Sequence, residues 1–336
     1  MLRLFLLVAV ARAQFFITLE QFMTPPQIIG NRGYPAETHS VVTPDGYILT
    51  LHRIPRGRVG LGGGRPVLLQ HGLFSSSFDW LTTATNLSLS YSLADAGYDV
   101  WLGNHRGNLY SNAHVTYSNL DKRFYNFTWD EMSLYDYPAT VDYILNVTRQ
   151  PNLYAVGHSQ VVVVIVILFM FKLIILNSAP SLSTTHLGSA LLNLGAQFPD
   201  LAEKRTLFQS LLPLATAHFP AGASDKNMIH WLQQVRNGTR YFDYGSAGNM
   251  AAYGTPYPRE FNFANYSVPT SMYFSPSDKL VSTEDMKVAF SRLPASAIQK
   301  IRNITGFGHF EFIWGNRAKA EVYDEIIADI NRMEGR

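Results

Sequence analysis

Apolar and polar positions alternate early in the chain in the way that half-buried strands require. Residues 39–42 and 47–53 form two such stretches, and a Pro-Asp-Gly sequence lies between them. An Asp-Gly pair between two alternating stretches is typical of a tight turn, so the pattern predicts a β-hairpin. Three glycines at 62–64 separate this hairpin from the next apolar run, and we interpret them as a turn.

Further along, short continuous apolar runs predict strands that are buried on both faces. Such runs span residues 66–70 and 153–156, and further strands are expected at 98–102, 173–176, 270–274 and 299–304. Between them lie stretches of helical spacing, as at 135–146, and a closing helix is expected at 318–330. Alternating strands and helices imply a mostly parallel sheet with right-handed crossovers, so the expected fold class is α/β.

Residues 181–263 break this alternation. They are rich in Leu, Ala, Asn and aromatic residues, and helix-like spacing occurs only in patches such as 226–235. We expect this region to be a cap inserted over the carboxyl end of the sheet, where open α/β sheets bind ligands. The predicted core then consists of residues 14–180 and 264–336.

Composition agrees with a large globular core and excludes some classes of site and partner. Hydrophobic residues make up 47% of the 336 residues, and the formal net charge of +2 gives no argument for nucleic acid as a partner. The chain has no cysteine, which excludes thiolate metal sites and cysteine nucleophiles. No spacing of histidines is typical of metal ligands, and neither a metal nor an organic cofactor is expected.

The N-terminus has the features of a secretory signal peptide. An apolar run at residues 4–10 follows a basic residue and precedes an Ala-Arg-Ala sequence, which predicts cleavage after Ala13. The run is too short to span a bilayer, although a buried N-terminal helix would have the same pattern. Six Asn-x-Ser/Thr sequons support passage through the secretory pathway and are candidate glycosylation sites: Asn86, Asn126, Asn146, Asn237, Asn265 and Asn303.

Three polar residues follow predicted strands in the order that a catalytic triad of an α/β fold requires. Ser159 lies between a buried strand and a run that could be helical, which is the setting of a nucleophile elbow. A serine hydroxyl needs an imidazole to take its proton and a carboxylate to orient that imidazole. Asp278 and His309 each lie on a loop after a later strand, so we predict them as acid and base.

Two backbone N–H groups are expected to form the oxyanion hole. One belongs to Gln160, directly after the predicted nucleophile, and the other to Leu73, in the loop after strand 66–70. Gly72 would let that loop approach the substrate, although a plain His-Gly turn would have the same sequence. His105 and Arg106 are expected to hold a loop near the site.

Several motifs are more specific than the fold and indicate a family. They include Leu-Gln-His-Gly-Leu at 69–73, Gly-Asn-His-Arg-Gly at 103–107, Gly-His-Ser-Gln at 157–160, Asn-Met-Ile-His-Trp at 227–231 and His-Phe-Glu-Phe-Ile-Trp at 309–314. Together with stretches at 28–39 and 43–49 they resemble the animal acid lipases, which include gastric and lysosomal acid lipase.

This resemblance implies an α/β-hydrolase fold with a helical cap, in a secreted or lysosomal enzyme. It also implies hydrolysis of triacylglycerol or cholesteryl esters at a lipid–water interface, often at mildly acidic pH. The residues implied for the reaction are the five already predicted, namely Ser159, Asp278, His309, Leu73 and Gln160.

The sequence departs from the family pattern directly after Gln160. The family has a glycine at the next position, whereas this chain has Val161, which begins an apolar tract that runs to Phe171. A branched side chain in the elbow is expected to cost about 1–3 kcal/mol and to displace the Gln160 N–H. A membrane span over 161–176 would be short and would contain Lys172, so we interpret the tract as a substituted segment.

Three hypotheses about function follow from the sequence. A lipid esterase that forms an acyl-enzyme at Ser159 is favoured, and it would require no transmembrane span. The alternative is a catalytically impaired relative that binds lipid or a protein partner, because Val161 replaces the elbow glycine and the cap is shorter than the family's. Another α/β-hydrolase reaction, such as peptide or thioester cleavage, agrees less well with the apolar insertion.

Overall fold

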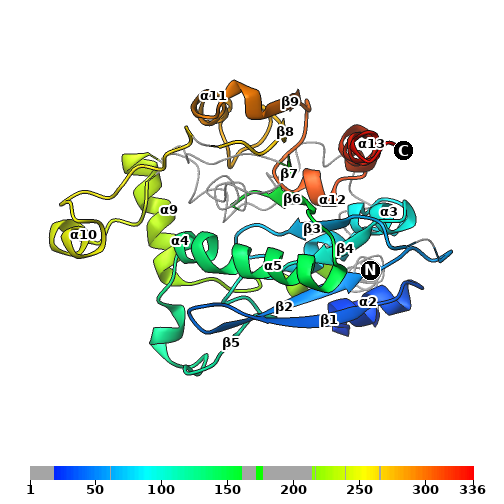
Figure 1. Cartoon of the computed structure of the whole chain (residues 1–336), viewed down its shortest axis with the longest axis horizontal. Coiled ribbons are helices and arrows are strands. Elements are labelled where there is room, and N and C mark those ends of the chain that lie inside the picture. The colour runs from blue at the N-terminus through cyan, green and yellow to red at the C-terminus, as the bar shows by residue number, and fades with distance from the viewer. Residues whose placement is uncertain are drawn as a thin grey trace, which may run out of the picture.

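The computed structural model describes residues 19–60, 62–160, 172–176, 214–215, 217–238, 240–264 and 266–336. The expected signal peptide, the tract 161–171 and much of the expected cap lie outside these residues. In the part that is described, nine strands form one sheet, which runs from β1 at the bottom of Figure 1 to β9 at the top.

The first strands form the antiparallel side of the sheet. β1 (Glu37–Val42) and β2 (Tyr47–Ile54) pair in antiparallel register, so the predicted hairpin is confirmed. β2 also pairs antiparallel with β4 (Asp99–Leu102) and with the short β5 (Ala113–His114). Gly46, the last residue of the hairpin turn, has a φ of 96°, a conformation that glycine adopts without steric cost.

The remaining strands are parallel, as the alternating pattern predicted. After β4 the order is β3 (Pro66–Gln70), β6 (Tyr154–His158), β7 (Lys172–Leu176), β8 (Thr270–Phe274) and β9 (Ile298–Asn303). Because these strands are parallel, their carboxyl ends meet at the same edge of the sheet. The loops that follow β3, β6, β8 and β9 can therefore contribute to one site.

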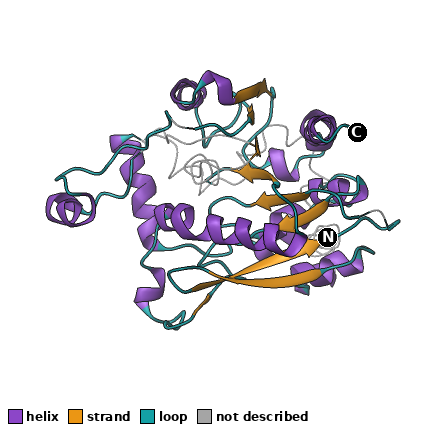
Figure 2. Cartoon of the chain, in the orientation of Figure 1, coloured by secondary structure: helices purple, strands orange, loops and turns teal. Residues whose placement is uncertain are grey.

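Helices cover both faces of the sheet (Figure 2). The longer ones are α2 (Pro25–Asn31), α3 (Leu89–Asp95), α5 (Tyr137–Thr148), α9 (Asp225–Asn237), α10 (Gly245–Tyr253), α11 (Thr283–Arg292) and α13 (Asp324–Met333). Shorter helical segments are η1 (Leu19–Phe22), η2 (Ser77–Leu81), η3 (Lys122–Tyr125), α4 (Trp129–Glu131), η4 (Met132–Asp136), η6 (Ala295–Ala297), α12 (Glu311–Trp314) and η7 (Lys319–Tyr323). The helices expected at 135–146, 226–235 and 318–330 correspond to α5, α9 and α13, the last preceded by the π-helical turn η7.

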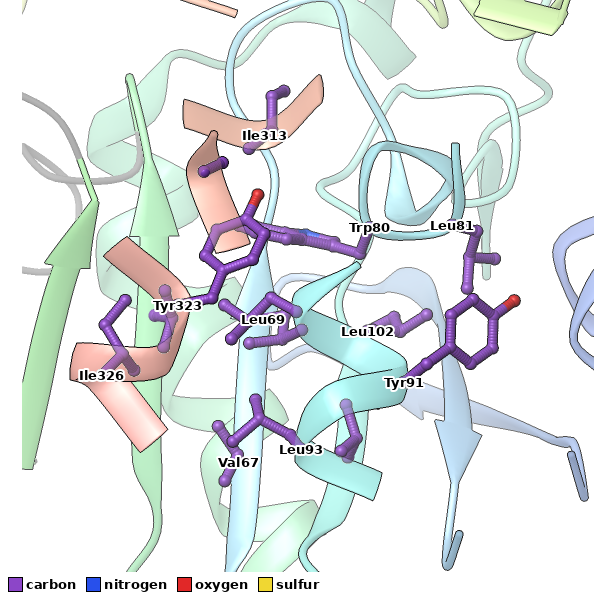
Figure 3. Packing of buried hydrophobic residues seen from close by; sticks show 14 of the residues in the cluster. Val67, Leu69, Trp80, Leu81, Tyr91, Leu93, Leu102, Ile313, Tyr323 and Ile326 are labelled. Carbon is purple, nitrogen blue, oxygen red and sulfur yellow. The ribbon is translucent and has the colours of Figure 1, made fainter. Parts of the chain in front are cut away.

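Side chains of β3 enter two separate cores, which explains its continuous apolar run. Val67 and Leu69 pack on one face with residues of α2, α3, α12 and α13, as Figure 3 shows for Leu93 and Ile326. Leu68 points to the opposite face, into a cluster that includes residues of α4, α5 and α9. Successive residues of a strand face opposite sides, so a strand with two covered faces is apolar at every position.

Candidate active site

Ser159 lies in a sharp turn directly after β6. Its φ is +60°, a left-handed conformation that is uncommon for a residue with a side chain. Such strain is maintained only where the surrounding structure enforces it, and it occurs often at catalytic positions. A β-carbon on Gly72 would lie 2.9 Å from the Cβ of Ser159, so only glycine lets the loop after β3 reach the serine.

The structure brings the three predicted triad residues into one hydrogen-bonded chain. His309 Nε2 lies 2.8 Å from Ser159 Oγ, and His309 Nδ1 lies 2.9 Å from Asp278 Oδ2. The other carboxylate oxygen of Asp278 accepts the backbone N–H groups of Leu280 and Val281 at 2.8 and 3.2 Å. Since the carboxylate accepts the proton on Nδ1, Nε2 has a lone pair directed at the serine hydroxyl.

Two further side chains hold the loop that contains His309. The Nε2–H of His158 donates to the carbonyl oxygen of His309 at 3.0 Å, and the N–H of Gly308 donates to Glu311 Oε2 at 2.6 Å. Burial, together with the nearby His309, lowers the pKa of His158 to about 3, so this imidazole is neutral at physiological pH. Neither role was predicted from sequence, although His158 and Glu311 lie in the motifs at 157–160 and 309–314.

The predicted oxyanion donors, Leu73 and Gln160, belong to segments that meet at the serine. Gln160 directly follows it, and Leu73 directly follows Gly72, the residue that abuts it. The loop that contains Leu73 is supported by the loop after β4, because His71 Nε2 accepts the N–H of His105 at 3.1 Å. His105 thus contacts the neighbouring loop through its backbone N–H.

Arg106 anchors the loop after β4. Its side chain is fully buried and forms ion pairs with Asp45 at 2.5 Å and with Asp136 at 2.6 Å. The guanidinium also stacks on Tyr47, 3.9 Å from the ring centroid. These contacts join the loop to the hairpin turn and to the segment before α5. Arg106 therefore has a structural role, in agreement with the sequence analysis.

Asp79 is a buried carboxyl that the triad does not use. It lies in η2, downstream of the Leu73 loop, and its Oδ2 has no hydrogen-bond partner in the described part of the chain. Burial raises the pKa of Asp79 to about 7, although Ser75 and the nearby His309 act in the opposite direction. The folded protein thus retains a proton here at pH values where an exposed aspartate would have lost it.

Asp79→Asn is expected to stabilise the protein more at pH 8 than at pH 4.5. Between about pH 4 and 7 the folded state binds this proton and the unfolded state does not, so wild-type stability falls as the pH rises. The variant lacks that loss, which is at most about 4 kcal/mol. Urea denaturation at both pH values measures the difference. The exposed Asp142→Asn is the control, and an equal effect of Asp79→Asn at both pH values would contradict the prediction.

Within the residues that the structure describes, no three His, Asp or Glu side chains are arranged to hold a metal ion. No helix in this part of the chain is long and apolar enough to cross a membrane. Of the predicted glycosylation sites, Asn86, Asn126, Asn146 and Asn303 are exposed. The structure does not describe the side chains of Asn237 and Asn265.

Two family models match the chain. A partial α/β-hydrolase lipase region matches residues 25–84, and the α/β-hydrolase fold matches residues 65–160. The first match contains the hairpin and the Gly72 loop, and the second extends through the nucleophile elbow. Both matches therefore lie on the part of the sheet that holds Ser159.

Relatives from animals match almost the full chain. Gastric triacylglycerol lipase of Bos taurus is 34% identical, with 92% of this chain and 91% of the relative covered. Lysosomal acid lipase/cholesteryl ester hydrolase of Homo sapiens is also 34% identical, with 92% and 90% covered. Lipase member M of Mus musculus is 35% identical, with 92% and 86% covered. The alternative of a catalytically impaired relative has no support in these comparisons.

Solved structures share the fold at much lower identity. A lipase from Acinetobacter baumannii has a TM-score of 0.52 at 15% identity, with 91% of this chain and 95% of that chain covered. Naproxen esterase of Bacillus subtilis has a TM-score of 0.53 at 15% identity, with 94% and 97% covered. These similarities establish the α/β-hydrolase fold, as predicted. The identity to the animal enzymes over nearly the full length goes further, and the chain belongs to the acid lipase family that contains the gastric and lysosomal enzymes.

Proposed function

We propose that this protein is a serine-dependent lipase that cleaves carboxylic esters of lipids, with triacylglycerol or cholesteryl ester as substrate. The observation that carries the proposal is the hydrogen-bonded chain from Ser159 through His309 to Asp278 at the carboxyl edge of the sheet. The names of the relatives, gastric triacylglycerol lipase and lysosomal cholesteryl ester hydrolase, supply the substrate class.

The geometry suits acyl transfer to the serine. His309 Nε2 takes the proton from Ser159 Oγ as the oxygen attacks the ester carbonyl carbon. The developing oxyanion is stabilised by the N–H groups of Leu73 and Gln160. Asp278 remains ionised and stabilises the imidazolium that forms. The imidazolium then donates this proton to the oxygen of the leaving alcohol, and the acyl group stays on the serine.

Deacylation repeats these steps with water. His309 removes a proton from the water as its oxygen attacks the acyl carbon, and the same two N–H groups stabilise the second oxyanion. Collapse of this intermediate releases the fatty acid and returns the proton to Ser159. Every proton moves between residues of this chain, the substrate and water, so the reaction requires no cofactor.

The enzyme would act at a lipid–water interface. Residues 14–180 and 264–336 would form the catalytic core, with residues 181–263 as the cap. The exposed sequon asparagines agree with passage through the secretory pathway, after removal of residues 1–13. The destination would be extracellular or lysosomal, as the names of the relatives suggest.

Labelling with a fluorophosphonate probe tests the proposal. We expect stoichiometric labelling at Ser159, located by peptide mass spectrometry, because the probe reacts with an activated serine. The same preparation should release fatty acid from emulsified triolein or cholesteryl oleate. A protein that binds the emulsion but neither reacts nor hydrolyses would instead be an inactive lipid-binding relative. Labelling with hydrolysis of thioesters or peptides alone would indicate another α/β-hydrolase reaction.

A further inference from the structure

We propose that residues 221–231, which lie within the expected cap segment 181–263, are a positioning element for both donors of the oxyanion hole. This inference rests on the proposed function, because it assigns a role within the same site. The segment has two separate contacts, one with the loop that contains Leu73 and one with the side chain of Gln160. We call residues 221–231 the brace.

The first contact holds the loop after Leu73. The N–H of Ala221 donates to the carbonyl oxygen of Phe74 at 2.6 Å, and the carbonyl oxygen of Ala221 accepts the N–H of Leu109 at 2.7 Å. Phe74 has a φ of +60°, which is strained for a bulky residue and needs external support. The hydrogen bond from Ala221 gives that support directly after the donor N–H of Leu73.

Close packing keeps this part of the brace in place. Gly222 has a φ of +104°, and a β-carbon there would lie 2.9 Å from the carbonyl oxygen of Gly107. The brace therefore lies against the loop after β4, the same loop that supports His71. The loops after β3 and β4 and the brace thus form one hydrogen-bonded unit beside Ser159.

The second contact holds Gln160 through its side chain. Asn227 Nδ2 and Trp231 Nε1 both donate to Gln160 Oε1, at 3.0 and 2.7 Å. The two donors lie four residues apart, so they share one face of α9. All three side chains are buried, at 1% exposure or less for Gln160 and Asn227 and at 3% for Trp231.

The start of α9 is itself fixed to the core. Ser224 Oγ donates to the carbonyl oxygen of Phe127 at 2.5 Å and accepts the N–H of Asn227 at 3.0 Å. Two hydrogen bonds therefore hold Asn227, one from its backbone N–H to Ser224 and one from its side chain to Gln160. An anchor of this kind restricts rotation of the peptide unit whose N–H stabilises the oxyanion. It also acts next to Val161, where the acid lipase pattern has glycine.

A positioning role makes a specific kinetic prediction. The oxyanion N–H groups act more strongly on the tetrahedral transition state than on the bound ester. Loss of an anchor should therefore lower kcat and weaken a transition-state analogue by the same factor, with KM unchanged. A purely structural role in folding would lower the amount of active protein instead, without changing kcat per labelled site.

Trp231→Phe is the central test, because it removes the N–H donor and retains an aromatic ring against Trp129. We expect kcat per labelled site, with a soluble p-nitrophenyl ester, to fall about tenfold at unchanged KM. Binding of a boronic acid inhibitor should weaken about tenfold as well. Gln233→Ala is the matched control, since it removes two hydrogen bonds of α9 to Asp243 that do not contact Gln160.

A double-mutant cycle separates the hydrogen bond from other effects of the substitution. Gln160→Met removes the acceptor at similar volume and leaves the backbone N–H. In that background Trp231→Phe should cost nothing more in kcat. Equal kcat for Trp231→Phe and Gln233→Ala would overturn the proposal, as would a rise in KM at constant kcat.

Hydrogen–deuterium exchange tests the brace without depending on catalysis. Ala221→Pro removes the N–H that donates to Phe74, and Ala221→Gly retains it. We expect faster exchange in peptides that cover residues 71–77 for the proline variant only, and in peptides that cover residue 160 for Trp231→Phe only. Unchanged exchange in both variants would overturn the brace. A wild-type protein that is neither labelled nor active would overturn the proposed function. The exchange measurements would then still show whether residues 221–231 hold the two loops.

Discussion

Ser159→Ala is expected to lower kcat for ester hydrolysis about a millionfold, the largest effect of any single change in this protein. The substitution removes the oxygen that attacks the ester and leaves the Cβ that packs against Gly72. His309 and Asp278 then have no nucleophile to activate. Initial rates with a p-nitrophenyl ester measure the loss, and the fluorophosphonate probe should no longer react.

A second serine serves as the control for this loss. Ser291 lies on α11, where its hydroxyl donates to the local carbonyl of Val288. Ser291→Ala should retain wild-type kcat, and both variants should unfold within a few degrees of the wild type. Hydrolysis by Ser159→Ala at close to the wild-type rate would remove the serine from the mechanism.

Asp278→Asn is expected to lower kcat about ten-thousandfold. The asparagine Oδ1 can still accept the N–H of Leu280, but its amide N–H₂ then faces His309 Nδ1. The imidazole must place its proton on Nε2, and it then has no lone pair to accept the serine proton. Stopped-flow measurement of the acyl-enzyme burst should show that acylation itself is slowed.

Asp285, seven residues after Asp278 along the chain, provides a matched comparison. It lies in the first turn of α11, where its N–H donates to Ser282 Oγ. Asp285→Asn changes the same functional group without contacting His309, so its kcat should remain near that of the wild type. If the two variants lost activity equally, a general effect on folding would explain the loss better than the tautomer of His309.

β3 and β8 were predictable from sequence because both of their faces are buried, whereas β9 is mostly exposed. The bounds predicted at 66–70 and 270–274 are those of β3 and β8, and both strands are almost entirely buried. Other elements have too few buried apolar residues, or are too short, to be predicted from the hydrophobic pattern. Only Met286 of α11 is buried, so that helix has no broad apolar stripe, and β5 is two residues long.

The triad residues were proposed from sequence because each follows a predicted strand, in the order along the chain that an α/β-hydrolase requires. The anchors of Gln160 could not be found in this way. Trp231 and Asn227 lie in a quoted motif, but their role depends on which face of α9 meets the elbow. His158 and Asp79 likewise depend on contacts between segments far apart in the sequence, and such contacts leave no local pattern.

Ser159 and His309, which form one hydrogen bond, lie 150 positions apart in the chain. A nascent chain that has been translated only as far as β8 therefore contains the serine and no base to activate it. The hydrolytic centre can form only after β9 and the loop that contains His309 have been synthesised. A lipase built in this way is inert until that loop has folded against Ser159, because no base can activate the serine before then.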